Sequence, residues 1–259
     1  GADRGLFITF EGGDGAGKST QIRRLAGALR RDGYPVTVSR EPGGTPGAEA
    51  VRHVVLDTSA AEPFGPYLEA MLFAAARNDH VEQTIRPALK RGEIVLVDRF
   101  MDSTRVYQGA SENLDSNFVR ALERVAIADV VPDLTIILDL SPSEGLRRAH
   151  ARRDPNAPAD RFEKEDVAAH EIRRQAFLDI AEREPARCRV VDASREPEDV
   201  AKDIARLVAG GIEKKGIASS RSAAMRAISL CGDTGPERVR RMSGKSPSIT
   251  WRAGSNFKR

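Results

Sequence analysis

A glycine-rich segment near the N-terminus carries the side chains best suited to phosphate chemistry. Residues 12–19 read GGDGAGKS and fit the pattern G-x-x-x-x-G-K-[ST]. Glycines at these positions let backbone N–H groups turn towards phosphate oxygens. Lys18 is placed to contact β- and γ-phosphates, and the Ser19 hydroxyl to ligate Mg²⁺. We therefore expect nucleotide phosphates to be bound by Gly12, Gly13, Asp14, Gly15, Ala16, Gly17, Lys18, Ser19 and Thr20.

The segments on either side of this loop have the character that it requires. Residues 6–10 form a short apolar run with β propensity, and residues 18–31 show helical periodicity. A strand, a glycine loop and a helix in this order form a phosphate loop, and the helix N-terminus adds positive potential. An ordinary glycine-rich turn is the alternative, and the four matching positions with both flanks argue against it.

Two charged residues follow the buried strand predicted over residues 93–97. An acid at the carboxyl end of such a strand, here Asp98, can hold Mg²⁺ directly or through water. Arg99 could bridge two phosphate groups through its forked guanidinium. A simple ion pair at the end of a strand remains the alternative explanation.

A third group of side chains could bind a flat heterocycle and a sugar. Phe73 and Arg77 lie four residues apart in a helix predicted over residues 66–91, so they share one face. An aromatic plane beside a guanidinium suits a base with carbonyl edges. Without the neighbouring motifs, a core Phe with a surface Arg would be the better explanation of this pair. One further helical turn presents the uncharged hydrogen-bonding groups of Ser103, Thr104, Tyr107 and Gln108.

Two further segments lie where ligands could bind. A loop rich in glycine and proline, residues 40–47, follows a predicted strand, which is where α/β proteins bind ligands. It contains Glu41 and Pro42. Arginines flank a second loop, residues 154–159, and predict a lid that closes over phosphates. A solvated charged helix is the alternative for these arginines, which include Arg148, Arg152 and Arg153.

Strand and helix patterns alternate along the chain, which predicts a three-layer α/β fold. About five parallel strands would be covered by helices on both faces, with the lid above their carboxyl ends. The strands are expected at residues 6–10, 36–39, 93–97, 134–140 and 187–191. The helices are expected at residues 18–31, 48–56, 66–91, 114–130, 143–153, 161–183 and 197–208.

The charge of this 259-residue chain is unevenly distributed. Residues 211–259 contain 11 Lys/Arg and 3 Asp/Glu, which leaves 30 basic and 35 acidic residues in the remainder. We therefore predict one domain, which carries the phosphate loop, over residues 1–212 and a basic, mostly disordered extension over residues 213–259, where a short helix could span residues 220–230. Nucleic-acid binding is not expected, except through this extension.

The sequence favours a cytoplasmic location. No apolar run approaches the 18 residues of a membrane span, and the N-terminus does not show the pattern of a secretory signal. The two cysteines, Cys188 and Cys231, have neither CxxC nor zinc-site spacing.

Four segments together resemble the thymidylate kinase family, of the bacterial type, within the P-loop nucleoside monophosphate kinases. They are FEGGDGAGKST at residues 10–20, REPGGT at 40–45, DRF at 98–100 with the polar turn at 103–109, and the lid that ends at Asp160 and Arg161. The resemblance covers about residues 5–210. The glycine loop occurs in many NTPases, whereas the combination in this order is specific.

The resemblance implies transfer of the γ-phosphoryl group from Mg·ATP to dTMP by a homodimer. It implies that Phe73 stacks on thymine, that Arg77 reaches a thymine carbonyl, and that Tyr107 occupies the space of a ribose 2′-hydroxyl. Asp14 would contact the 3′-hydroxyl, and Arg99 would hold the acceptor phosphate. The implied substrate-binding residues are Asp14, Glu41, Pro42, Phe73, Arg77, Arg99, Ser103, Thr104, Tyr107 and Gln108.

One position distinguishes subtypes within the family. Some members carry an arginine in the glycine loop, where this chain has Gly15. The resemblance then implies that lid arginines supply the missing charge. The implied catalytic residues are Lys18, Asp14, Arg99, Arg148, Arg152 and Arg153, with Ser19 and Asp98 at the metal.

Two other functions remain open at this point. A kinase for another nucleoside or nucleotide could use the same scaffold, although Phe73, Arg77 and Tyr107 favour a thymine deoxynucleotide. A nucleotide-dependent switch or binding module is less consistent with the sequence, because the N-K-x-D guanine signature is missing and a second ligand pocket is predicted.

Overall fold

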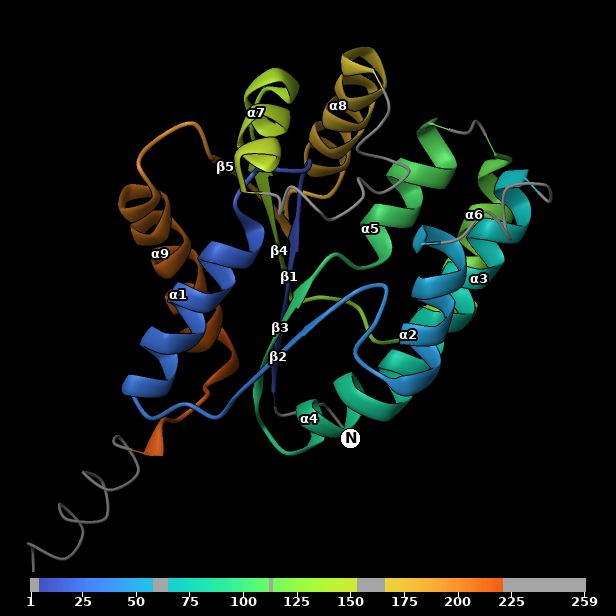
Figure 1. Cartoon of the computed structure of the whole chain (residues 1–259). Coiled ribbons are helices and arrows are strands. Elements are labelled where there is room, and N and C mark those ends of the chain that lie inside the picture. The colour runs from blue at the N-terminus through green and yellow to red at the C-terminus, as the bar shows by residue number, and fades with distance from the viewer. Residues whose placement is uncertain (1–4, 58–64, 112–113, 153–165, 221–259) are drawn as a thin grey trace, which may run out of the picture. The chain divides into compact units, whose positions relative to one another are not determined.

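The fold is built on one five-stranded parallel sheet (Figure 1). The computed structural model describes residues 5–57, 65–111, 114–152 and 166–220. The spatial order of the strands is β2-β3-β1-β4-β5. Their bounds are β1 Leu6–Glu11, β2 Val36–Arg40, β3 Ile94–Asp98, β4 Leu134–Asp139 and β5 Cys188–Asp192. The predicted parallel sheet is confirmed.

Helices cover both faces of the sheet, with α1 and α9 on one side and α2, α3 and α6 on the other (Figure 1). The helices are α1 Lys18–Arg31, α2 Pro46–Arg52, α3 Gly65–His80, α4 Arg86–Lys90, α5 Met101–Thr104, α6 Ser116–Ile127, α7 Pro142–Arg152, α8 Val167–Arg183 and α9 Pro197–Lys215. Within the described ranges, the π-helical segments His53–Asp57, Val81–Ile85 and Arg105–Ser111 extend or join them. None of the described helices is long and apolar enough to cross a membrane.

The central strands are apolar on both faces because both faces are covered. In β1, Leu6 and Ile8 pack into the core beneath α1 and α9. The residue between them, Phe7, packs into the opposite core with Val81 and Ile85. This alternation is the period-two pattern of a strand, and it fixes which polar residues reach the carboxyl edge.

Several predicted helices differ in extent from the structure. The helix predicted over residues 161–183 is observed as α8 from Val167, after Asp166 as its N-cap. The long helix predicted over residues 66–91 is α3, a π-helical segment and α4 in succession. The last helix, predicted to end near residue 208, continues to Lys215 and ends at Gly216, a left-handed residue with φ 63°. Glycines 210 and 211 lie inside the helix and do not end it, and a Cβ added at Gly211 would meet Leu6 of β1 at 3.5 Å.

The start of the predicted extension is therefore helical up to Lys215. Beyond α9, the Ser220 N–H donates to the Gly33 carbonyl at 2.9 Å. The helix predicted over residues 220–230 and the predicted disorder after it concern residues that, from 221 on, lie outside the described part of the chain. The predicted lid loop, residues 154–159, also lies outside it.

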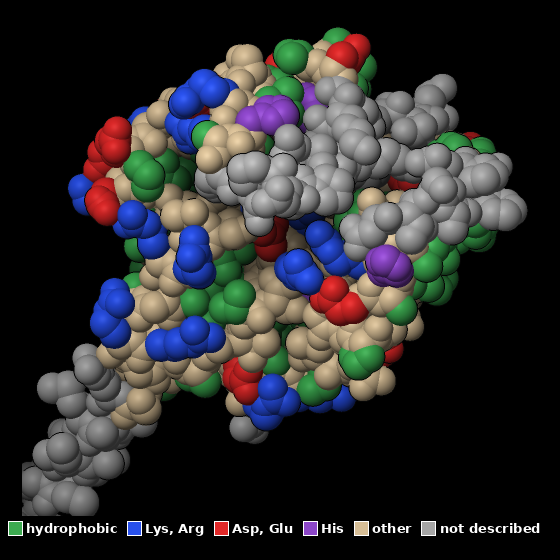
Figure 2. Space-filling view, in the orientation of Figure 1, with side chains coloured by type: hydrophobic (Ala, Val, Ile, Leu, Met, Phe, Trp, Pro, Cys, Tyr) green, Lys and Arg blue, Asp and Glu red, His purple; other side chains and the backbone are tan. Residues whose placement is uncertain are grey.

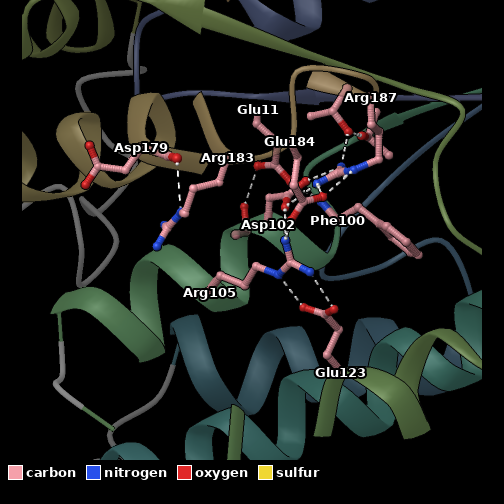
Figure 3. Close-up of polar contacts among 12 residues, drawn as sticks. Glu11, Phe100, Asp102, Arg105, Glu123, Asp179, Arg183, Glu184 and Arg187 are labelled. Carbon is pink, nitrogen blue, oxygen red and sulfur yellow. Dashed lines mark hydrogen bonds and ion pairs between the residues drawn. The ribbon is translucent and has the colours of Figure 1, made fainter. Parts of the chain in front are cut away.

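A network of charged side chains anchors α5 beside the sheet (Figure 3). The carboxylate of Asp102 is fully buried and accepts from Arg187 Nη1 at 2.7 Å and Nη2 at 3.0 Å. Arg187 also donates to Thr135 of β4. Arg105, three residues after Asp102, forms ion pairs with Asp102, Glu123 and Glu184. The network therefore connects α5 with α6, the end of α8 and the central strands.

Replacing Arg187 should destabilise the fold strongly. Arg187→Met leaves the buried Asp102 carboxylate without its bidentate partner, a change that typically costs about 3–5 kcal/mol. Urea unfolding measures the loss. The matched control is Arg183→Met, because Arg183 is exposed and donates, among the described residues, to the Asp179 carbonyl of its own helix. Equal unfolding free energies for the two variants would contradict a stabilising role for the buried pair.

Candidate active site

The phosphate loop joins β1 to α1 through three glycines with positive φ. Gly12, Gly15 and Gly17 have φ of 130°, 74° and 95°, a region that favours residues without a Cβ. The Lys18 ammonium is buried and donates to the carbonyls of Gly12 and Gly13, both at 3.0 Å. Burial, followed by the nearby Arg99, lowers the pKa of Lys18. The loop thus holds a cation at its base.

The loop also packs backbone to backbone against the first turns of α7. A Cβ added to Gly15 would lie 1.9 Å from the Gly145 carbonyl oxygen, and one added to Gly145 would lie 2.4 Å from the Asp14 carbonyl oxygen. Neither position accommodates a side chain in this arrangement. The structure therefore explains why position 15 carries no arginine.

A turn with left-handed backbone follows β3 and faces the loop. Arg99 has φ 65°, an uncommon conformation for a residue other than glycine. Its Nη2 donates to Asp14 Oδ1 at 2.8 Å. Burial alone would raise the pKa of Asp14, but Arg99 and then Lys18 outweigh that effect and hold it below its usual value. The loop and the turn are therefore joined by an ion pair.

Two buried polar atoms of this turn have no hydrogen-bond partner among the described residues. They are Arg99 Nη1 and Asp98 Oδ1. The other Asp98 oxygen accepts from Ser19 Oγ at 3.1 Å. Buried polar atoms in proteins are nearly always paired, so these two indicate that ligand atoms complete the site.

A cavity of about 340 Å³ opens beside the loop and the turn. Figure 2 shows basic side chains grouped at the hollow in the middle of this face. All the residues predicted to bind substrate line this cavity, as do the predicted metal residues. Its lining comprises Asp14, Gly15, Gly17, Lys18, Ser19, Arg40, Glu41, Pro42, Arg52, Leu56, Phe73, Arg77, Asp98, Arg99, Ser103, Thr104, Tyr107 and Gln108.

At one end of this cavity, Arg77 is held rigidly from several sides. Its Nε donates to Glu41 at 2.6 Å, Nη1 to Thr104 at 2.8 Å and Nη2 to the Phe100 carbonyl at 2.9 Å. These bonds use three of the five guanidinium N–H groups. Glu41 also pairs with the buried His80. The Glu41–Pro42 peptide bond is cis.

The predicted polar turn at residues 103–108 has a different backbone path from the one expected. α5 is only one turn long, and residues 105–111 are π-helical. Ser103 donates to Glu11 at 2.7 Å. Gln108 donates to the buried Glu69 at 2.8 Å. The side chains still converge on one cavity, although not through the α-helical spacing that predicted it.

Two guanidinium groups lie over the ring of Tyr107. The Cζ atoms of Arg99 and Arg173 are 5.1 and 4.6 Å from the ring centroid. Such cation–π contacts are stronger when water is excluded, and Tyr107 is buried. Burial raises the pKa of Tyr107 to about 12, with Arg99 opposing it. The phenol is therefore neutral at physiological pH and its ring is held in place.

A second cavity, of about 330 Å³, lies on the other side of the phosphate loop. Gly15 and Gly17 line both cavities, so the loop forms their shared wall. The lining comprises Gly15, Ala16, Gly17, Thr20, Gln21, Arg147, Arg148, Ala151, Ala193, Ser194, Arg195, Glu196, Pro197 and Val200. Predicted residues Gly12 and Gly13 line neither of these cavities and instead border a much smaller one.

The predicted lid arginines are only partly visible. Arg148 lines the second cavity, where it donates to the Ala193 carbonyl at 3.0 Å and to Glu144 at 2.7 Å. It does not line the first cavity. The side chain of Arg152 and the whole of Arg153 lie outside the described residues.

Several lining residues were not predicted from the sequence. Arg52 and Leu56 belong to the first cavity, and residues 193–197 to the second. Arg40 also lines the first cavity; it begins the loop at residues 40–47 that was expected to bind ligands, although it was not named as a site residue. Residues 193–197 follow the carboxyl end of β5, and the rule that α/β sheets bind ligands at that edge could have identified them. Arg52 and Leu56 come from helical positions with no sequence signal of their own.

Comparisons with known proteins agree on one family. The family model for thymidylate kinase matches residues 10–204. The chain is 52% identical over 200 residues to a thymidylate kinase of Bradyrhizobium sp. (strain ORS 278), covering 77% of this chain and 88% of that protein. It is 53% identical over 198 residues to a thymidylate kinase of Bradyrhizobium diazoefficiens, covering 76% and 86%. A solved thymidylate kinase from Ehrlichia chaffeensis is 32% identical, with a TM-score of 0.62, over 79% of this chain and 98% of that one.

The contact between the loop and α7 can be tested with one methyl group. Gly145→Ala places a Cβ against the Asp14 carbonyl, so α7 must move, and overpacking of this kind costs about 1–3 kcal/mol. Gly27→Ala in α1 is the control, because its Cβ would meet only the end of Arg31 at 3.5 Å. Chemical unfolding should show a loss for the first variant alone. A Gly145→Ala protein as stable as the control would contradict the close packing.

Proposed function

Because the chain belongs to the thymidylate kinase family, we propose that its two cavities bind dTMP and ATP with their phosphates meeting at the phosphate loop. The reaction is transfer of the γ-phosphoryl group of ATP to dTMP, which gives dTDP and ADP. The observation that carries the proposal is the shared wall: Gly15 and Gly17 line both cavities.

The first cavity is assigned to dTMP. Phe73 offers a ring for stacking on thymine, and Arg77 keeps guanidinium N–H groups for a thymine carbonyl, with Thr104 and Gln108 beside the base. Tyr107 closes the side where a ribose 2′-hydroxyl would project. Three bonds hold Arg77 in place, so little side-chain entropy is lost when the base binds. Glu41, Pro42 and Ser103 complete the wall.

The phosphates are assigned to the cationic groups between the cavities. The Nη1 of Arg99 is buried and has no hydrogen-bond partner among the described residues. It could therefore donate to the acceptor phosphate. Lys18 at the loop suits the donor phosphates, and Asp14 is placed to orient the 3′-hydroxyl of the acceptor. The acceptor is already an anionic phosphate, so the reaction needs alignment and charge neutralisation rather than a strong base.

A divalent cation fits the same edge. The Ser19 hydroxyl donates a hydrogen bond to one carboxylate oxygen of Asp98. The other oxygen is buried and has no hydrogen-bond partner among the described residues. The described residues contain no group of three or more His, Cys, Asp or Glu side chains placed to hold a metal. Mg²⁺ bound with ATP needs few protein ligands, since phosphates and water supply the rest, and it would neutralise phosphate charge. We assign Ser19 and Asp98 to Mg²⁺.

The second cavity is assigned to the rest of ATP, with Thr20 and Arg148 on its wall. We propose that the transferring phosphoryl group is stabilised by arginines of α7 and of the segment after it, namely Arg148, Arg152 and Arg153. They would supply the positive charge that position 15 lacks, because it is a glycine. An arginine in this role is worth about 10³-fold or more in rate.

We propose that the enzyme is a cytoplasmic homodimer. Exposed apolar side chains support an interface on the paired helices α3 and α6, namely Tyr67 and Met71 on α3 and Val125 on α6. Residues 213–259 are not assigned a role in the reaction, and nucleic-acid binding is proposed for none of the described residues.

A coupled assay for ADP release tests the function. ADP should form rapidly with dTMP present and at a background rate without it, and dTMP should be used better than dCMP or thymidine. Lys18→Ala should lower turnover by orders of magnitude while the circular dichroism spectrum is retained. An ADP release rate that is the same with and without dTMP would indicate a nucleotide-dependent switch. Faster turnover of dCMP or thymidine than of dTMP would indicate a kinase for a different substrate.

Selectivity for deoxyribose should depend on the ring of Tyr107. Tyr107→Ala should raise kcat/KM for ribothymidine 5′-phosphate relative to dTMP by about tenfold or more, the usual value of one well-placed steric contact. Tyr107→Phe keeps the ring and should keep most of the discrimination. Unchanged discrimination in Tyr107→Ala would show that the ring serves only to fill the core.

A further inference from the structure

Glu11, the last residue of β1, is a fully buried carboxylate with both oxygens in use. Its Oε1 accepts from the Phe100 backbone N–H at 2.8 Å, and its Oε2 accepts from the Ser103 hydroxyl at 2.7 Å (Figure 3). Both donors belong to the segment directly after Arg99. The phosphate-binding interpretation of the loop gives Glu11 no role.

The segment that Glu11 holds contains a backbone conformation that needs support. Arg99, with φ 65°, has a conformation that typically costs about 1–3 kcal/mol unless its surroundings enforce it. The Arg99 N–H donates to the Phe10 carbonyl at 2.9 Å. The next N–H, from Phe100, goes to Glu11. Two consecutive residues of β1, Phe10 and Glu11, therefore accept hydrogen bonds from two consecutive backbone N–H groups of the turn.

We propose that the Glu11 carboxylate is a positioning residue that fixes the turn carrying Arg99, and so sets the affinity for the acceptor phosphate in a pH-dependent way. The proposal rests on the proposed function, in which Arg99 holds the phosphate of dTMP. Glu11 touches neither substrate. It acts by directing the guanidinium of Arg99 into the cavity and towards Asp14.

The burial of Glu11 and the charges around it raise the pKa of its carboxyl into the neutral range. Burial first, and then the neighbouring Asp102, raise the pKa of Glu11 to about 7, against the opposing effects of Arg99, Ser103 and the Phe100 N–H. The charge of Lys18 also interacts with that of Glu11. Asp102 stays close because Arg187 and Arg105 hold it.

The direction of the pH effect on KM for dTMP follows from the raised pKa of Glu11. Above pH 7 the carboxylate accepts from both donors, and hydrogen bonds to a charged acceptor are about twice as strong as neutral ones. As the pH falls through about 7, Glu11 takes up a proton and both bonds weaken. Arg99 is then less firmly held, so KM for dTMP should rise on the acid side.

The test compares pH profiles of wild type and Glu11→Gln, with KM measured separately for dTMP and ATP. Gln has the same shape and cannot ionise. At pH 8, Glu11→Gln should raise KM for dTMP about tenfold, which corresponds to losing one charge-assisted bond, while KM for ATP changes less than about twofold. The rise of KM for dTMP below about pH 7, the acid limb of the profile, should vanish in this variant. The remaining pH dependence should be that of the dTMP phosphate, which titrates near pH 6.

A matched control is Glu93→Gln. Glu93 is a partly buried carboxylate that accepts from Thr37 and Arg91 and lines neither large cavity. Its bonding partners hold its pKa below the usual value, so it stays ionised throughout the tested range. The variant should show the wild-type profile. An acid limb near pH 7 that persists in Glu11→Gln, with KM for dTMP unchanged, would overturn the proposal.

A second variant decides the matter if Glu11→Gln does not fold. Ser103→Ala keeps Glu11 but removes a hydrogen bond that lowers its pKa, so the acid limb should move to higher pH. An unmoved limb in this variant would overturn the proposal. Failure of the proposed function itself is distinguishable, because wild-type protein would then release no ADP in response to dTMP.

Discussion

The ion pair between Asp14 and Arg99 is the interaction on which the site depends. β1 and β3 are neighbouring parallel strands, with Phe10 opposite Asp98, so their carboxyl ends deliver the phosphate loop and the Arg99 turn to one edge. The 2.8 Å contact sets the final distance between them. It also places an anion between two cations, Lys18 and Arg99, that would otherwise repel each other in a buried setting. A cationic site for phosphates can thus exist before any phosphate binds.

The surrounding contacts make this arrangement rigid. Gly15 and Gly145 are in such close backbone contact that neither position has room for a Cβ. Gly15 and Gly17 also form the shared wall of the two cavities. Beneath the turn, the buried pair of Asp102 and Arg187 anchors α5. Rigid placement matters for phosphoryl transfer, because the rate depends on alignment of the two phosphates more than on acid–base chemistry. Membership of the thymidylate kinase family follows from the sequence comparisons, and the geometry shows how this chain would meet that requirement.

Much of the fold and the first cavity could be predicted from local sequence patterns. The strand at 93–97 identified Asp98 and Arg99, because parallel strands end at a common edge. Phe73 and Arg77 followed from helical spacing. What failed depended on contacts between distant segments. The hydrogen bond between Ser103 and Glu11 spans 92 positions, and α9, whose continuation past two glycines was not predicted, packs against β1. Neither has a signature in the sequence around it.

The most direct test of the account is a crystal structure with dTMP and a non-hydrolysable ATP analogue bound together. The account predicts thymine beside Phe73, the dTMP phosphate on Arg99, and the γ-phosphate analogue facing it across the loop beside Lys18. Thymidine nucleotide bound outside the first cavity, or two phosphate ends held on opposite sides of the loop and far apart, would contradict it.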